Sequence, residues 1–307
     1  MEVEKLNIIQ KFFLKYTNRP AYINYRAARR NIKLNKRFFN GTETFDRSLI
    51  THAYKERTSF KHSGNCGDII YSLPAVWELA KNGKAEYYLQ IDQPTRYNNH
   101  HPLKNVMLNQ KMAEMLKPLL LYQPLCKSCE IYNGEQVDYD LDVFRKFILL
   151  PDRGNIARWY FNVFAVSASL SEPWLIAPKD PTMKDAILIA RSHRYRNPNI
   201  SYSFLQKYPN VKFIGVEEEF LDMKSSIPNL EHKQVNDFLE MATLVNSCKL
   251  FIGNQSFPFA IAEGLKTNRL LEVYYQSPNV IVEGKGGYDF LFQPHFELMV
   301  EHLLSIG

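Results

Sequence analysis

From about residue 57 onwards, apolar and polar positions follow two alternating patterns. The segments RTSFKHSG and AEYYLQID are short and rich in β-branched and aromatic residues, which is typical of strands. Between them, DIIYSLPAVWELAKNG has apolar residues three and four positions apart, as in a helix with one buried face. These three segments predict a β-α-β unit, in which a right-handed parallel crossover is expected.

The rest of the chain repeats this alternation. Residues 109–147 predict a helix, a strand around CEIY and a polar turn at NGEQ, and residues 154–170 predict a further helix. A second series then starts with the strand AILIARS and a helix at SYSFLQKY, residues 201–208. It continues through the strands VKFIGV and KLFIGN, each followed by one helix, and the strand RLLEVYY, to a last helix near HFELMVEHLLS. Two such series predict an α/β protein with two doubly wound, Rossmann-like domains that face each other.

The segment SEPWLIAPKDPTMKD between the two series is dense in Pro and Asp and has little periodicity, which is typical of a linker. We therefore expect an N-terminal domain at residues 56–177 and a C-terminal domain at residues 178–307. Residues 1–55 predict a mostly helical, basic extension laid over the core, with breaks at NRP and FNGTETF.

Composition narrows the cellular context. The 307 residues are 45% hydrophobic, yet there is no apolar run long enough to span a membrane and no cleavable signal peptide is expected. Four cysteines are too few for a disulfide framework, which fits a reducing compartment. We therefore expect a cytoplasmic protein, either free or peripheral to the inner face of the membrane.

The net charge of +6 is concentrated near the N-terminus. One interpretation of this basic segment is a surface for nucleic acid, anionic lipid or an acidic acceptor. The other is a solvated helix face whose long side chains cover apolar neighbours. The basic residues of the segment are Arg26, Arg29, Arg30, Lys33, Lys36 and Arg37.

The first candidate site is the turn from the strand RTSFKHSG into its helix, with Gly64, Asn65, Gly67 and Asp68. Glycine permits positive φ and close approach of a ligand to the backbone, and a helix N-terminus offers free N–H groups. Asp68 is expected at that N-terminus, where Asp is a favoured cap and needs no further role. The spacing is not that of a dinucleotide fingerprint.

The second candidate site repeats this architecture in LFIGNQSFPFAIAEGL, where a strand meets Gly253, a polar turn and a helix. Asn254, Gln255 and Ser256 are expected to bind a phosphate at the helix N-terminus, although Ser256 is equally suited to capping. Glu263 is interpreted either as a solvated charge or as an acceptor for a ribose diol.

A third cluster follows the first strand of the second series, in RSHRYRNPNISYSF. It contains Arg191, His193, Arg194 and Arg196, and guanidinium groups suit a pyrophosphate. The alternative is a basic surface loop. Because this loop and the Asn254 turn should open at the same edge of a parallel sheet, an anionic ligand is favoured.

Two other motifs are interpreted as structural. Cys126 and Cys129 form a single C-x-x-C without a second pair, so neither zinc nor thioredoxin-like chemistry is expected. Asp138, Asp140 and Asp142 lack the glycine and the terminal Glu of a calcium loop, so a polar strand edge or turn is favoured over a metal site.

The two turns together resemble a known family. GNCGDIIYSLPAV is similar to the N-terminal motif of the ADP-heptose:lipopolysaccharide heptosyltransferases, a glycosyltransferase family 9 pattern. The segment from VNDFLEMATL to RLLEVY resembles their C-terminal motif, in which a strand leads to Asn-Asp-Ser-Gly-Pro and an alanine-rich helix. The order of the motifs also agrees, from roughly Thr58 to the C-terminus.

The resemblance implies a GT-B fold, with the acceptor held mainly by the first domain and a nucleotide-sugar donor mainly by the second. Asp68 matches the carboxylate regarded as the general base. We expect an inverting transfer to a glycan or other hydroxyl acceptor, without metal or other cofactor, with Arg194, Arg196 and Ser256 stabilising the leaving diphosphate. Gln255 and Ala260 depart from the family pattern, in which Asp and His stand at these positions.

Two other functions remain open from the sequence. The altered Asn254-Gln255-Ser256 turn also suits a nucleotide-sugar-binding protein that has lost turnover. The basic segment from Arg26 to Arg37 also suits a protein that binds or modifies nucleic acid.

Overall fold

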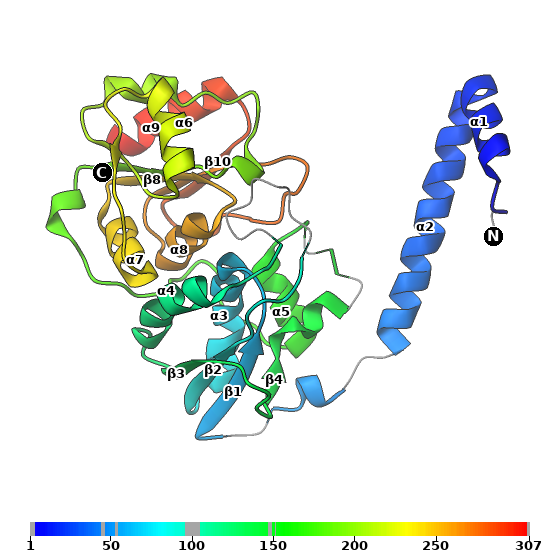
Figure 1. Ribbon diagram of the computed structural model, residues 1–307, viewed down its shortest axis with the longest axis horizontal. Helices are drawn as coiled ribbons and strands as arrows, with labels where there is room; N and C mark the ends of the chain where they lie inside the picture. Colours follow the sequence, from blue (N-terminus) through cyan, green and yellow to red (C-terminus); the bar gives the residue numbers. More distant parts are fainter. Residues whose placement is uncertain are drawn as a thin grey trace.

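The computed structural model describes residues 4–43, 47–52, 55–95, 105–146, 149–150 and 152–305. Within them, two parallel sheets are surrounded by helices (Figure 1). The α-helices are α1 (Ile8–Thr17), α2 (Arg19–Glu43), α3 (Cys66–Ala80), α4 (Gln110–Leu121), α5 (Ile156–Phe164), α6 (Glu217–Ser226), α7 (Phe238–Ser247), α8 (Phe257–Leu265) and α9 (Gln293–Ser305). The strands are β1 (Arg57–His62), β2 (Lys84–Leu89), β3 (Cys126–Ile131), β4 (Tyr139–Asp140), β5 (Ile187–Ala190), β6 (Val211–Phe213), β7 (Glu231–His232), β8 (Leu250–Asn254), β9 (Arg269–Glu272) and β10 (Gly287–Phe290).

The first sheet has the strand order β3-β2-β1-β4. The predicted β-α-β unit is confirmed, since α3 connects β1 to β2 and the two strands pair in parallel along their length. The chain order reverses between β1 and β4, and ligands of open α/β sheets bind beyond the carboxyl ends of the strands at such a point. The turn that contains Asp68 follows β1 directly.

The second sheet has the order β10-β9-β8-β5-β6-β7, with every described pair parallel. Counted from β5, this is the doubly wound order 3-2-1-4-5-6 read from one edge to the other. In this sheet the direction in which successive strands are added reverses between β5 and β8. The basic loop after β5 and the Asn254 turn at the end of β8 therefore share one sheet edge, as expected.

One apolar core joins the two sheets. Helix α8 packs against α3, and α7 packs against α4 (Figure 1). A single cluster of buried side chains extends from Phe60 and Ile70 near the first sheet to Phe251 and Phe259 near the second. The two Rossmann-like units are thus in direct apolar contact.

The segment between the two sheets is tightly held, unlike a free linker. The Trp174 indole donates to the Ile70 carbonyl of α3 (3.2 Å), and the Trp174 carbonyl accepts from the Trp77 indole (2.9 Å). The backbone N–H groups of Trp174 and Leu175 both donate to the Gly264 carbonyl of α8. The segment is therefore bound to both units.

Most predicted elements are confirmed, but the strands β7 and β10 were not predicted and two helical segments differ from the expectation. Residues 201–208, expected to be helical, form only a short 3₁₀ helix, η5 (Ser203–Lys207). Helix α6 was not predicted, because it buries only Met223 and lacks an apolar face. Its acidic first turn, Glu217 to Glu219, stabilises the N-terminal end of the helix dipole.

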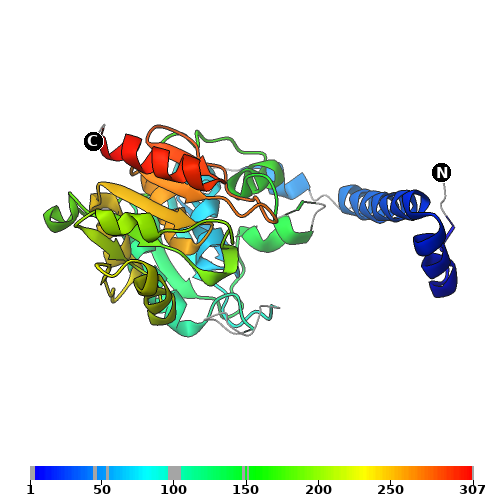
Figure 2. The ribbon, with the colours of Figure 1, turned by 90° about the horizontal axis from the view of Figure 1, so that it is seen from above.

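The N-terminal extension is helical as predicted, but it is not laid over the core. Helices α1 and α2 form a hairpin that stands away from both sheets (Figures 1 and 2). The break at Asn18 is confirmed, whereas α2 continues through the second expected break as far as Glu43. In the part of the chain that the structure describes, no helix combines the length and the apolarity needed to cross a bilayer.

Candidate functional site

The first candidate site lies where β1 turns into α3. Asp68 occupies the third position of α3, and its Oδ2 accepts the backbone N–H of Asn65 (3.3 Å). Asp68 therefore takes part in capping α3 as its third residue, whereas the N-cap position itself is occupied by Asn65. The same oxygen accepts a hydrogen bond from Nη2 of Arg145 (2.9 Å), and within the described residues Oδ1 accepts none.

Arg145 holds the Asp68 carboxylate in place. It lies on the 3₁₀ helix η2 (Leu141–Lys146), which directly follows β4 across the reversal point of the sheet. Its guanidinium also pairs with Asp142, three residues earlier. Sequence reasoning missed Arg145, and the only signal for it was this spacing from Asp142.

A buried histidine supports the same turn. Nδ1 of His62 accepts the N–H of Gly64 (2.8 Å), so the ring proton lies on Nε2 and is donated to the Tyr160 hydroxyl (2.8 Å). That hydroxyl in turn donates to the backbone carbonyl of Asp68 (3.4 Å). Burial lowers the pKa of His62 to about 4, so the imidazole is neutral at pH 7.

Gly64 is required by the space available. A Cβ at this position would lie 2.4 Å from Nη2 of Arg145 and 2.8 Å from Oδ2 of Asp68. Any larger residue would enter the contact between these two side chains. A Cβ at Gly67 would meet only the Cα of Phe257, at 3.8 Å, which is an ordinary contact.

The two motifs interpreted as structural are used within the fold. Cys126 and Cys129 lie on β3, and burial raises the pKa of their thiols to about 11 and about 12. Asp138 pairs with Lys55, and Asp140 pairs with Lys61. Among the described residues, no cluster of His, Cys, Asp and Glu could hold a metal ion.

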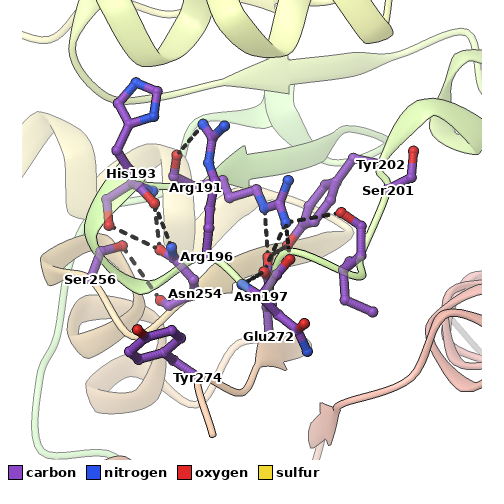
Figure 3. Close-up of polar contacts among 12 residues, drawn as sticks. Arg191, His193, Arg196, Asn197, Ser201, Tyr202, Asn254, Ser256, Glu272 and Tyr274 are labelled. Atoms are coloured by element: carbon purple, nitrogen blue, oxygen red, sulfur yellow. Dashed lines mark hydrogen bonds and ion pairs between the residues drawn. The ribbon is translucent and has the colours of Figure 1, made fainter. Parts of the chain in front are cut away.

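The second candidate site lies at the edge shared by β5 and β8 (Figure 3). Asn254 is fully buried, and its amide accepts the N–H of Ser192 (3.1 Å) and donates to the Ser192 carbonyl (2.7 Å). Gly253 permits this close approach, because a Cβ there would lie 2.9 Å from the Ala190 carbonyl oxygen. Both residues thus join the two strand ends.

Gln255 holds the loop that follows β9. Its Oε1 accepts the N–H of Tyr274 (2.6 Å), and its Nε2 donates to the Ser277 carbonyl (2.7 Å) and to Oδ1 of Asn279 (2.8 Å). The Asn279 carbonyl accepts the N–H of Ile156 in α5 (3.1 Å). Gln255 therefore supports a loop that reaches the first unit.

The arginines after β5 have different environments. Arg191 is buried and binds the fully buried Glu272 through Nε (2.6 Å) and Nη2 (2.8 Å), so its interpretation as part of an exposed basic loop is wrong. Tyr202 donates to the same carboxylate (Figure 3). Arg196 pairs with Asp222 of α6 and donates to the Arg191 carbonyl. Both guanidinium groups are thus engaged within the protein.

Arg194 lies on the surface of this loop. Its guanidinium stacks on the Tyr195 ring at 4.7 Å, and Tyr195 lies 5.9 Å from the Tyr274 ring. The imidazole of the neighbouring His193 is exposed and points away from the buried cluster (Figure 3). The two tyrosines, which sequence reasoning missed, form an aromatic surface beside Arg194.

Glu263 is almost fully buried in α8, so its interpretation as a solvated charge is wrong. Its carboxylate pairs with Lys266 and with Arg269, each at 2.5 Å, and accepts the N–H of Glu283. Both oxygens are used inside the protein. Ala260, at the position where the family pattern has histidine, is fully buried in the shared core.

The two candidate sites meet between the sheets. Ser256 is the N-cap residue of α8, and Phe257 begins that helix beside Gly67 of α3. In the first turn of α8, Pro258 has no N–H, and the N–H groups of Phe259 and Ala260 bond to the Ser256 carbonyl. The N–H of Phe257 has no hydrogen-bond partner in the described chain. The N-termini of two helices from different units thus lie together.

No protein-family model and no curated protein matches the sequence. Solved structures do match the fold. The E. coli heptosyltransferase WaaC with ADP aligns with a TM-score of 0.55 at 8% identity, over 80% of this chain and 99% of its own.

Two further structures agree. E. coli ADP-heptose lps heptosyltransferase II aligns with a TM-score of 0.52 at 13% identity, over 81% of this chain and 98% of its own. The glycosyl transferase family 9 structure from Veillonella parvula DSM 2008 aligns with a TM-score of 0.51 at 13% identity, over 84% of this chain and 91% of its own. The predicted GT-B fold is confirmed.

Proposed function

We propose that this chain, which has the GT-B fold of the heptosyltransferases, is a glycosyltransferase that moves a sugar from a nucleotide-sugar donor to an acceptor hydroxyl. The observation that carries the proposal is that the two places where the strand order reverses, one in each sheet, lie together. Gly67, next to Asp68 at the start of α3, lies against Phe257, next to Ser256 at the start of α8. Ligands of such folds bind at these points.

The donor is proposed to bind at the edge of the second sheet. The N–H of Phe257 and the dipole of α8 favour a phosphate there, and Arg194 adds a positive charge. Tyr195 and Tyr274 offer aromatic faces for a nucleobase. The neighbour WaaC was solved with ADP and with an ADP-2-deoxy-2-fluoro heptose, which supports a nucleoside diphosphate as part of the donor.

The acceptor is proposed to bind at the first sheet, with Asp68 as the general base. A general base must lie within hydrogen-bond reach of the proton that it takes. Because Arg145 and Asn65 both bind Oδ2, Oδ1 is left to accept the hydroxyl proton. Arg145 then holds the carboxylate in this orientation.

In this mechanism the acceptor oxygen attacks the anomeric carbon from the face opposite the leaving diphosphate, and the configuration inverts. Arg194, Ser256 and the N-terminus of α8 stabilise the charge that develops on the diphosphate. Fixed donors of this kind replace a divalent cation. Arg196 and Glu263 are left out, because their charged groups are already bound within the protein.

The first experiment identifies the donor. The purified protein is screened by thermal shift against nucleoside diphosphates and sugar nucleotides, with magnesium and with EDTA, since a ligand of the folded state raises the unfolding midpoint. A shift with one nucleotide, equal under both conditions, is expected. No shift with any member of the panel would contradict the donor site.

The second experiment tests the base. Asp68→Asn keeps the size of the side chain but removes its basicity, so transfer is expected to fall by about 10²- to 10⁴-fold with donor affinity unchanged. Near-normal turnover would refute the assignment of Asp68. Donor binding by the natural chain without transfer or hydrolysis would instead identify a binding protein that has lost turnover.

A further inference from the structure

Helix α1 turns its apolar face to solvent. At 100° per residue, Ile8, Ile9, Phe12, Phe13 and Tyr16 fall within an arc of roughly 140°. All five side chains are between 65% and 83% exposed. The helix is nevertheless well formed, since Asn7 and Gln10 make a reciprocal capping box at its N-terminus.

The opposite side of α1 is the side that meets α2. Leu14 is half-buried there, and the backbone N–H of Leu6 donates to the Tyr25 hydroxyl of α2 (3.1 Å). The hairpin therefore uses one side of α1 for its own packing and leaves the richer apolar side uncovered. A cluster of exposed apolar side chains on one face indicates an interaction surface.

The hairpin is also strongly basic. Residues 5–42 contain ten Lys and Arg and no Asp or Glu, so their net charge is +10. Because the whole chain has a net charge of +6, the remaining residues together carry −4. The ten are Lys5, Lys11, Lys15, Arg19, Arg26, Arg29, Arg30, Lys33, Lys36 and Arg37.

These charges are ordered along the helices. Lys11 and Lys15 lie beside the apolar arc of α1 at helical spacing. On α2, Arg19, Arg26 and Arg30 are separated by seven and four residues and so share one face, which Lys33 extends. An apolar face bordered by basic residues is the pattern of helices that lie in the interface of an anionic membrane.

We propose that the α1–α2 hairpin binds the surface of an anionic phospholipid bilayer. The apolar face of α1 enters the boundary between headgroups and acyl chains, and the basic side chains bind the lipid phosphates. The hairpin stands away from both sheets, so this contact leaves the rest of the protein outside the membrane (Figure 2). The proposal does not depend on the proposed transfer reaction.

The chemistry favours lipid over the other occupants. Nucleic acid would bind the basic face of α2, but its phosphates give no partner to Ile8, Ile9 and Phe12. A second copy of the chain would cover the apolar face, but it would bring two strongly basic hairpins together. An anionic bilayer accommodates both features at once.

The test is flotation of the full-length protein with vesicles. Neutral phosphatidylcholine vesicles are compared with vesicles in which 30 mol% is phosphatidylglycerol, a composition chosen to give about the anionic surface of a typical membrane. Binding to the anionic vesicles only, weakened at high salt, is expected. Phe12→Trp provides a second readout, because the fluorescence of the new Trp should shift to the blue when α1 enters the bilayer. The natural protein, whose Trp residues all lie outside the hairpin, gives the background emission.

Two double variants separate the contributions. Arg26→Ala with Arg30→Ala should lower partitioning about 30-fold, from about 1 kcal/mol for each basic residue near an anionic surface. Phe12→Ser with Phe13→Ser should lower it at least about tenfold, since each ring loses its apolar burial. Lys184→Ala with Lys285→Ala removes two exposed charges from the body and should leave partitioning unchanged.

Three results would overturn the proposal. The first is equal or absent binding to both kinds of vesicle. The second is binding to duplex nucleic acid that the arginine variant loses and the phenylalanine variant keeps, with no vesicle binding. The third is a stable oligomer in sedimentation velocity that the phenylalanine variant dissociates, again with no vesicle binding.

Discussion

Two glycines at the start of α3 offer a sharp test of the candidate base. The substitutions Gly64→Ala and Gly67→Ala each add one methyl group, three residues apart in the same turn. At Gly64 the methyl group would lie 2.4 Å from Nη2 of Arg145, 2.6 Å from Cε1 of His62 and 2.8 Å from Oδ2 of Asp68. At Gly67 the nearest described atom is the Cα of Phe257, at 3.8 Å.

The two substitutions should therefore have opposite effects on stability. Overpacking at Gly64 is expected to cost about 1–3 kcal/mol of unfolding free energy. At Gly67, which lies within a helix, Ala is expected to be neutral or to stabilise by up to about 1 kcal/mol. Urea unfolding of the two variants measures the difference directly.

Activity should separate them further. The methyl group at Gly64 must push Arg145 away from Asp68, and a displacement of about 1 Å at a catalytic group is enough to cost about 10²-fold in rate. Arg145→Gln removes the ion pair without crowding, so its loss of transfer should match that of Gly64→Ala. If Gly64→Ala unfolded like Gly67→Ala and kept turnover within about twofold of it, the proposed role of the Arg145–Asp68 contact would be refuted.

Two further predictions concern buried groups outside this contact. Glu272→Leu leaves the Arg191 guanidinium buried without its partner and should lower the free energy of unfolding by about 3–5 kcal/mol. The double variant Glu272→Leu with Arg191→Met should recover most of that loss in denaturant unfolding. Losses that simply add in the double variant would contradict the pairing. Because the pKa of His62 is lowered from 6.5 to about 4, the unfolded chain binds more protons between these values, and stability should fall by about 2 kcal/mol from pH 7 to pH 5. His62→Asn should show a shallower slope in this range, and an unchanged slope would show that His62 does not titrate as described.

The parts of the fold that sequence could predict are those with strong local patterns. The β-α-β unit around α3 has a regular apolar spacing, and its elements were placed within a few residues. The meeting of Ser192 with Asn254 followed from parallel topology, which brings strand ends to one edge. Topology was therefore enough to predict that the loop after β5 and the Asn254 turn lie together.

The parts that sequence could not predict depend on long-range pairing. Arg145 reaches Asp68 across 77 residues, and Arg191 reaches Glu272 across 81. A charged residue in a loop motif carries no sign of whether it faces solvent or a buried partner. The sequence therefore leaves a basic surface loop open for Arg191, and Glu263 of α8 is open in the same way to interpretation as a solvated charge, although the structure buries both.

The core that runs from Phe60 through the α3–α8 contact to Phe251 has a consequence for cooperativity. Neither half can unfold without exposing apolar surface on the other, so heating should give one calorimetric transition whose measured and van't Hoff enthalpies agree. A fragment ending at the Trp174 segment would present the uncovered faces of α3 and α4 to water, and it should aggregate rather than fold. Two sheets in this chain thus make one thermodynamic unit.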